Sequence, residues 1–176
     1  MEHIGDLRGP RPFRPDIGLP LALPGWLLLC VGGGFAVGAL FPPDAWFAAL
    51  KQPSFAPPNW LFAPVWTVLY ALMAFAMWRV GEEGTANARF ARSLFLVQLA
   101  LNFAWPVFFF GMHSINGALA IIVALLGSIV ATTISIHRVD PGAAKMMAPY
   151  VAWVAFATVL NAGYSYLNSA YFAFLR

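Results

Sequence analysis

The chain has 176 residues, of which 61% are hydrophobic and 10% charged, and its formal net charge is +3. A soluble domain carries roughly 25% charged residues, so this chain has too few to cover a surface that faces water. We therefore expect an integral membrane protein. The single cysteine, Cys30, excludes an internal disulfide and a cysteine-based zinc site. The basic residues form no run interleaved with aromatics, which disfavours a nucleic-acid partner.

Residues 1–22 are rich in arginine and proline and predict an extended, mobile tail. Five apolar segments follow, each near the roughly 20 residues that a helix needs to cross a bilayer. They lie at about 23–41, 60–79, 94–110, 117–136 and 146–167. The expected fold class is all-α, a bundle of five transmembrane helices over residues 23–168, with residues 169–176 as a C-terminal tail. A basic tail before an apolar run also resembles a signal peptide, but this run is too long for one, which favours a retained first span.

The distribution of lysine and arginine predicts the orientation of the spans. Eight of these ten residues lie in the N-terminal tail and in the 79–93 and 137–145 segments, and the other two are Lys51 and Arg176. The side richer in lysine and arginine is usually cytoplasmic. We therefore expect a cytoplasmic N-terminus, with the 42–59 loop and the C-terminus outside, in an inner or plasma membrane.

Local signals predict where two of the helices begin. Asn59 follows two prolines and is the expected N-cap of the second helix. Pro64 would then fall in the second turn, unless the regular helix starts later and Pro64 lies in its first turn. Asp140 followed by Pro141 predicts an N-cap and first helical residue, so the fifth helix is expected to begin before its apolar part.

Charge-based and metal-based chemistry find little support in this sequence. No span contains Asp, Glu, Lys or Arg inside its apolar core, although ion-coupled transporters usually place such a group in the membrane. His3, His113 and His137 lack the spacing of metal ligands, and there is no P-loop or dinucleotide-binding motif. We therefore expect no metal site and no conventional hydrolase or ATPase activity.

Aromatic and amide side chains inside the spans are the strongest remaining signal. Trp66, Trp105 and Trp153 lie within spans, where an interfacial belt of aromatics does not account for them. Helical spacing places residues of the third and fifth helices on two faces: Gln98, Asn102 and Trp105 on one, and Trp153, Ala157, Asn161 and Tyr164 on the other. Buried amides need partners in lipid, so both faces should point into the bundle. They serve either as a ligand site or as interhelical hydrogen-bond links.

Small residues indicate where helices approach one another. Gly32, Gly33, Gly34 and Gly38 in the first span permit close packing or leave room for a flat ligand. Ala100 and Ala104 in the third span form a small-xxx-small pair, which predicts a helix-pairing face and favours a homodimer.

Three ordered stretches carry a family resemblance: P-S-F-A-P-P-N-W-L-F-A-P-V-W-T-V-L-Y at 53–70, Q-L-A-L-N-F-A-W-P-V-F-F-F-G at 98–111 and P-Y-V-A-W-V-A-F-A-T-V-L-N at 149–161. In these stretches the chain resembles the tryptophan-rich sensory protein / translocator protein family, also called the peripheral benzodiazepine receptor family. The resemblance implies a five-helix membrane bundle, often a homodimer, whose members bind protoporphyrin IX and related tetrapyrroles such as haem. Eukaryotic members also bind sterols and synthetic ligands.

The resemblance further implies a pocket that takes a porphyrin as ligand, requires no cofactor and is closed by the 42–59 loop. The implied wall is Trp46, Phe55, Phe62, Trp66, Asn102, Trp105, Trp153, Ala157 and Leu160. Trp66 and Trp153 match tryptophans implicated in light-dependent porphyrin breakdown in some bacterial relatives, and are the catalytic candidates. Phe55 stands where the family often has tryptophan. Ala162 and Tyr166 stand where the family's sterol-recognition stretch requires tyrosine and a basic residue, which counts against sterol binding.

The leading hypothesis is a membrane protein that binds tetrapyrroles and acts in porphyrin transport, disposal or signalling. Asn102, with Gln98 or Asn161, would orient polar edges of the ligand, and Lys51, the basic residue of the 42–59 loop, would lie nearest its propionates. One alternative is an enzyme that degrades porphyrin under light. Another is an exporter of hydrophobic compounds, disfavoured by the lack of a carboxylate within the membrane.

Overall fold

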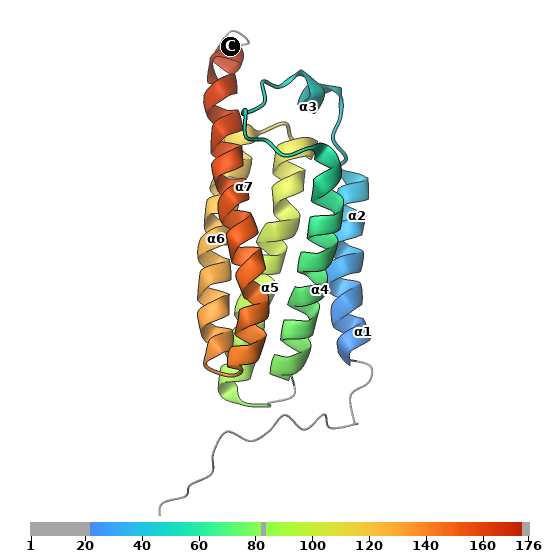
Figure 1. Cartoon of the computed structure of the whole chain (residues 1–176), viewed down its shortest axis with the longest axis vertical. Coiled ribbons are helices and arrows are strands. Elements are labelled where there is room, and N and C mark those ends of the chain that lie inside the picture. The colour runs from blue at the N-terminus through green and yellow to red at the C-terminus, as the bar shows by residue number, and fades with distance from the viewer. Residues whose placement is uncertain (1–21, 82–83, 174–176) are drawn as a thin grey trace, which may run out of the picture.

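A computed structural model describes residues 22–81 and 84–173, and this part of the chain is an all-helical bundle (Figure 1). Five helical spans are long and apolar enough to cross a membrane: Ala22–Leu40, Asn59–Gly81, Ala86–Gly111, Ile115–His137 and Pro141–Ser169. The predicted all-α fold class with five spans is confirmed. Most of the predicted N-terminal tail (residues 1–21) and residues 174–176 lie outside the described residues.

Several spans are built from more than one helical element. The first comprises α1 (Ala22–Leu27), a π-helical turn (Leu28–Gly32) and α2 (Gly33–Leu40). The second comprises a 3₁₀ turn (Asn59–Leu61) and α4 (Phe62–Gly81), and the third comprises α5 (Ala86–Pro106) and a π-helical turn (Val107–Gly111). The fourth and fifth are α6 (Ile115–His137) and α7 (Pro141–Ala173), while the short α3 (Ala45–Ala49) lies in the first loop.

The structure tests the two predicted helix starts. Asp140 caps α7 as expected, because its Oδ1 accepts hydrogen bonds from the amides of Gly142 at 2.8 Å and Ala143 at 3.1 Å. The prediction for Asn59 is wrong: Asn59 lies inside the 3₁₀ turn, and the residue at the cap is Pro58, which has no side-chain acceptor. Pro64 consequently falls in the first turn of α4, where a missing amide hydrogen costs little.

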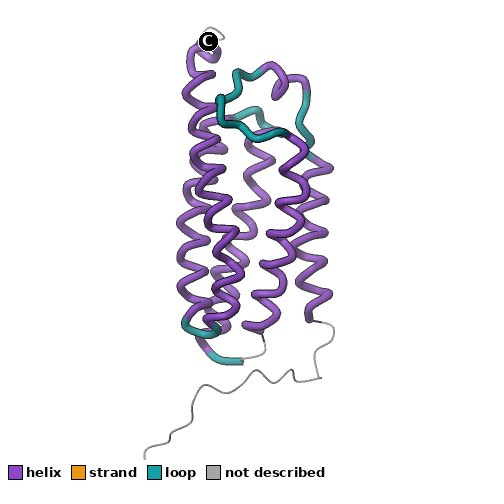
Figure 2. The backbone as a smooth tube through the Cα atoms, viewed as in Figure 1, coloured by secondary structure: helices purple, strands orange, loops and turns teal. Residues whose placement is uncertain are grey.

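The five spans form a ring in the order first, second, fifth, fourth and third. The first span packs against α4, α4 against α7, α7 against α6 and α6 against α5, and α5 closes the ring on α2. The 41–58 loop, which carries α3, crosses the end of the bundle where α7 ends (Figure 2). We call this the lid end, and the opposite end, where α6 turns into α7, the base.

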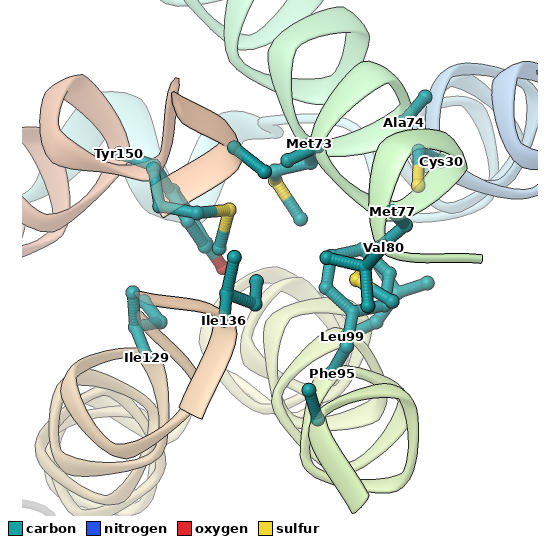
Figure 3. Packing of buried hydrophobic residues seen from close by; sticks show 14 of the residues in the cluster. Cys30, Met73, Ala74, Met77, Val80, Phe95, Leu99, Ile129, Ile136 and Tyr150 are labelled. Carbon is teal, nitrogen blue, oxygen red and sulfur yellow. The ribbon is translucent and has the colours of Figure 1, made fainter. Parts of the chain in front are cut away.

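Toward the base the interior is closely packed with apolar side chains from all five spans (Figure 3). The fully buried residues there include Cys30, Met73, Met77, Phe95 and Ile136. Toward the lid end the core changes to a smaller cluster built around Phe109, Ile115, Leu160 and Tyr164. The base half therefore holds the helices together, and the lid half is where the interior can open.

Replacing Asp140 with alanine should destabilise the protein by roughly 1–3 kcal/mol, because the α7 cap is worth about 1 kcal/mol and the ion pair with Arg79, at 2.7 Å, is also lost. Partial burial raises the pKa of Asp140, but hydrogen bonds from Arg79 and from the amides of Ala143 and Gly142 outweigh burial and hold the pKa below its usual value. The stabilisation by the ionised Asp140 carboxylate is therefore fully present above the unfolded pKa of about 3.9. It disappears as pH falls through the lower folded-state value.

Thermal unfolding of the detergent-solubilised protein across a pH series measures this effect. Ser114→Ala is the matched control, since Ser114 caps α6 through the amide of Gly117 without a charged group. Its smaller loss should not change with pH. An Asp140→Ala loss that is equally independent of pH would contradict the assigned role of the carboxylate.

Candidate ligand-binding cavity

The lid half of the bundle contains a partly open cavity of about 560 Å³, within the range of small-molecule sites. Its wall takes residues from the first span, the first loop and all four other spans. Aromatic side chains form much of it: Phe35, Phe41, Phe47, Phe62, Trp66, Tyr70, Trp105, Phe109, Phe110, Trp153 and Tyr164. Among the described residues, no lysine, arginine, histidine, aspartate or glutamate lines it. The cavity can therefore bind a flat apolar molecule by burial and ring stacking.

Seven of the nine predicted wall residues line this cavity: Phe62, Trp66, Asn102, Trp105, Trp153, Ala157 and Leu160. The structure brings them together from α4, α5 and α7, three helices that are separated by long stretches of sequence. Helical spacing predicts inward faces for Asn102, Trp105, Trp153 and Ala157, whereas the family resemblance implies Phe62, Trp66 and Leu160; the structure has all seven in one wall.

The other two predicted residues, Trp46 and Phe55, lie in the first loop and do not line the cavity. The ring of Trp46 stacks on His113, with centroids 4.4 Å apart. Phe55 is 49% exposed and meets Phe156 edge-on, with centroids 6.4 Å apart. The ring that the loop does contribute to the wall is Phe47, which packs edge-on against Phe109 and Phe110.

A chain of hydrogen bonds crosses the bundle below the cavity. The hydroxyl of Tyr70 donates to Oδ1 of Asn102 at 2.6 Å, and Nδ2 of Asn102 donates to the hydroxyl of Tyr150 at 3.0 Å. Tyr150 in turn donates to Oε1 of Gln98 at 2.8 Å. The chain links α4, α5 and α7, and because Tyr70 and Asn102 also line the cavity, we call these four residues the polar floor.

A second buried amide, that of Asn161, links helices in the lid half in a similar way. Asn161 accepts a hydrogen bond from the indole N–H of Trp105 at 2.9 Å and donates from Nδ2 to the carbonyl of Ile115 at 3.1 Å. Asn102 and Asn161 therefore serve as interhelical links while lining the cavity. Gln98 is fully buried and takes part in the floor, but it does not line the cavity. Of the three amides expected to orient a ligand, two reach the cavity, both already engaged with protein partners.

The two indoles that are catalytic candidates have different surroundings. Trp66 packs against Tyr70 and Tyr150, with ring centroids 5.3 and 6.2 Å away. Trp153 packs against Phe62 and Phe156, each 5.7 Å away. Its Nε1 is buried without a hydrogen-bond partner. Trp66 is thus held against the polar floor, whereas Trp153 is held by ring contacts alone.

The glycines of the first span fulfil both roles that the sequence left open. A Cβ at Gly33 would lie 2.7 Å from the ring of Phe103, and one at Gly34 would overlap the ring of Tyr70. These two glycines permit close helix packing. A Cβ at Gly38 would meet nothing within 4 Å, and Gly38 lines the cavity, so this glycine leaves room.

Long-range contacts fasten the first loop over the cavity. Asn168 of α7 holds the backbone of Lys51 from both sides, accepting from its amide and donating to its carbonyl, both at 3.0 Å. Asp44 caps α3 through the amide of Phe47 at 3.1 Å and lies 2.9 Å from Nε2 of His113. The Phe47 amide, together with His113, holds the pKa of Asp44 below its usual value. The loop is therefore attached at both of its halves.

Sequence reasoning did not single out Tyr70 and Tyr150, the two tyrosines of the polar floor. Tyr70 follows Trp66 by four residues and Tyr150 precedes Trp153 by three, so helical spacing places each on the same face as a candidate indole. This signal was present in the sequence. What the sequence did not carry is that the two hydroxyls meet at one asparagine.

Comparison with known proteins covers most of this helical region. A family model described as the TspO/MBR family matches residues 26–167. The Translocator protein of Homo sapiens is 39% identical over 153 residues, which are 85% of this chain and 88% of that protein. Protein CrtK of Rhodobacter capsulatus is 39% identical over 138 residues, covering 77% and 86%. The Tryptophan-rich sensory protein of Cereibacter sphaeroides is 36% identical over 135 residues, covering 76% and 84%. All nine predicted wall residues fall inside the matched range.

Proposed function

The chain belongs to the TspO/MBR family, and on that premise we propose that its cavity binds tetrapyrroles such as protoporphyrin IX and haem, and similar flat hydrophobic ligands. The observation that carries the proposal is the wall itself, in which Trp66, Trp105 and Trp153 meet around one space without a charged side chain among its described residues. The relatives' names, Translocator protein and Tryptophan-rich sensory protein, fit a role in porphyrin transport, disposal or signalling.

The ligand would be held chiefly by ring contacts and apolar burial. A favourably placed aromatic pair contributes roughly 0.5–1.5 kcal/mol beyond the burial of its area. The amides of Asn102 and Asn161 already form interhelical hydrogen bonds. They therefore contribute little to ligand selectivity, and their main effect is to limit how deep the cavity extends. The propionates of a porphyrin would point away from the apolar wall, toward the first loop and its exposed Lys51.

Titration with protoporphyrin IX, followed by tryptophan fluorescence, tests this proposal. Replacing Trp66 and Trp153 together with phenylalanine should raise Kd roughly tenfold. Each smaller ring buries less apolar area of the ligand, and a loss of about 0.7 kcal/mol at each site amounts to about 1.4 kcal/mol. The matched control is Trp26→Phe with Trp60→Phe, which removes two indoles that do not line the cavity. Equal Kd values for the two double variants would exclude the proposed site.

The second candidate is light-dependent breakdown of the bound porphyrin, favoured by the position of both Trp66 and Trp153 in the cavity wall. Illumination of the complex with and without oxygen, followed by mass analysis of products, separates breakdown from binding alone. Equal rates of product formation in the wild type and the Trp66→Phe, Trp153→Phe variant, both saturated with ligand, would exclude a role for these indoles.

We also propose an orientation with the base in the cytoplasm, in an inner or plasma membrane. The basic residues at the base end are Arg79, Arg89, Arg92, Arg138 and Lys145, whereas Lys51 is the basic residue of the lid loop within the described chain. The cytoplasmic side of a membrane protein usually carries this excess.

Pairing of two copies through α5 is a further part of the proposal. Ala100 is exposed and Ala104 half-buried on the outer surface of the bundle, with Val97 54% exposed beside them. Small residues four apart let two helices approach closely in lipid. Mass measurement of the protein in lipid nanodiscs would show whether it is a dimer.

A further inference from the structure

A second hollow lies between α4 and α7, on the outside of the bundle beneath the first loop. This groove has a volume of about 900 Å³ and is lined by Pro57, Trp60, Leu61, Pro64, Val65, Val68, Leu69, Pro149, Ala152, Trp153 and Phe156. Trp60 is 72% exposed and Val68 58% exposed. Because the second span starts at Asn59, the groove runs from the lid end to about the middle of the membrane. An apolar, outward-facing groove at this depth is open to the hydrocarbon of the lid-side leaflet.

The groove and the cavity share a wall at Trp153, which lines both. Phe62, on the cavity side, and Phe156, on the groove side, each pack against its ring with centroids 5.7 Å away. Pro57 of the first loop also lines both spaces. What separates the two spaces at this point is therefore an aromatic side chain.

The indole ring of Trp153 is also held by fewer interactions than that of Trp105, another tryptophan of the cavity wall. The indole N–H of Trp105 donates to Asn161 at 2.9 Å, so turning that ring breaks a buried hydrogen bond. The indole N–H of Trp153 has no partner, and turning its ring breaks none. A side chain with these properties, set between two apolar spaces, can act as a gate.

Entry into the cavity over the lid end is obstructed by specific contacts. Moving the first loop aside breaks the two hydrogen bonds between Asn168 and the backbone of Lys51 and separates Asp44 from His113. A hydrophobic molecule would also have to leave the bilayer to arrive there. Both considerations favour a route from the membrane over one from the lid end. Phe35 and Gly38 of the first span also line the cavity from exposed positions, but the α4–α7 side is where a separate apolar groove adjoins the cavity.

We propose that the groove between α4 and α7 is a lateral entrance, through which a flat hydrophobic ligand dissolved in the lid-side leaflet reaches the cavity, and that Trp153 is its gate. The proposal rests on the proposed function, because it requires that the cavity bind such a ligand. It adds the direction of approach and the residue that controls it.

Filling the groove without altering the cavity tests the entrance. Ala152→Phe and Val68→Phe add bulk from opposite walls, and both residues line the groove and not the cavity. The matched control is Ala124→Phe, at an exposed position of α6. Each full-length protein is placed in phosphatidylcholine nanodiscs and mixed with protoporphyrin IX. Stopped-flow tryptophan fluorescence gives the association rate, and transfer of ligand to empty vesicles gives the dissociation rate.

An obstructed entrance slows arrival and departure by the same factor. We expect both rates to fall at least tenfold in each groove variant, with Kd within twofold of the wild type and no change in the control. Wild-type association rates in both groove variants would overturn the entrance while leaving the proposed function in place. A faster dissociation with unchanged association would also overturn it, since the groove would then be only part of the site. Failure of the wild-type protein to bind protoporphyrin IX would remove the proposed function, and the entrance with it.

Discussion

Replacing Gly34 with alanine should destabilise the protein by roughly 2–4 kcal/mol, whereas the same change at Gly38, one turn later in α2, should be neutral or slightly stabilising. A Cβ at Gly34 overlaps the ring of Tyr70, so that ring must move, and the overpacking costs about 1–3 kcal/mol. The displaced hydroxyl also loses its 2.6 Å bond to Asn102, which leaves buried groups without partners. At Gly38 a Cβ meets nothing within 4 Å, and alanine favours the helix.

Thermal or denaturant unfolding of the two variants in the same detergent measures the difference. The comparison is closely matched, because the chemical change, the helix and the helix propensity gained are the same in both. Equal stabilities would show that the first span does not press against α4 at Tyr70 as the structure describes.

The fold class could be predicted because span length and apolar composition decide it locally. The choice of Trp105 and Trp153 as cavity rings also followed from local information, since helical spacing puts each on a face with an amide that must be buried. Trp66 stood out as a tryptophan within a span, and the family resemblance assigned it to the wall. The family resemblance added the loop as a cover, and the match over residues 26–167 confirms that family.

The contribution of the loop could not be predicted residue by residue. Its conformation depends on partners far along the chain, since Lys51 is held by Asn168, 117 positions away, and Asp44 faces His113, 69 positions away. These contacts turn Phe47 into the cavity and place Trp46 on His113. A proline-rich loop has no helical or strand periodicity from which one could predict that Phe47, and not Trp46, lines the cavity.

Inside the helices, too, the roles of individual glycine and asparagine residues could not be predicted from sequence. Gly34 and Gly38 lie four residues apart and carry the same sequence signal, yet only one faces a ring at close range. Sequence left open whether Asn102 served a ligand or the helices. The structure has it line the cavity while bonded to two tyrosines. What distinguishes such residues is the neighbour on another helix, which tertiary packing supplies.

The polar floor lies between the closely packed base half of the bundle and the lid half, which contains the cavity. Toward the base, closely packed methionine, isoleucine and phenylalanine side chains stabilise the bundle, while toward the lid end the cavity removes contacts that would otherwise do so. A space of this kind weakens the helix packing around it. Hydrogen bonds from Asn102 to α4 and α7 lie where that weakening begins, so they hold the helices in place at the level where packing stops.

Replacing Asn102 with leucine should therefore destabilise the protein by roughly 2–4 kcal/mol, although the two side chains are similar in size. The hydroxyl of Tyr70 loses its acceptor, while Tyr150 keeps its bond to Gln98, and one buried polar group left unpaired costs about 1–3 kcal/mol. Asn87→Leu, at an exposed site in the first turn of α5, is the control and should change stability by less than about 0.5 kcal/mol.

A double-mutant cycle assigns the loss to the floor. Tyr70→Phe alone removes the donor to Asn102, and in the Asn102→Leu background it should cost about 1 kcal/mol less than in the wild type, because the bond is already absent. Additive losses, measured by unfolding in one detergent, would mean that Asn102 and Tyr70 stabilise the bundle separately. In that case α4 would be held to α5 by ring packing, and the polar floor would not be the element that keeps the cavity open.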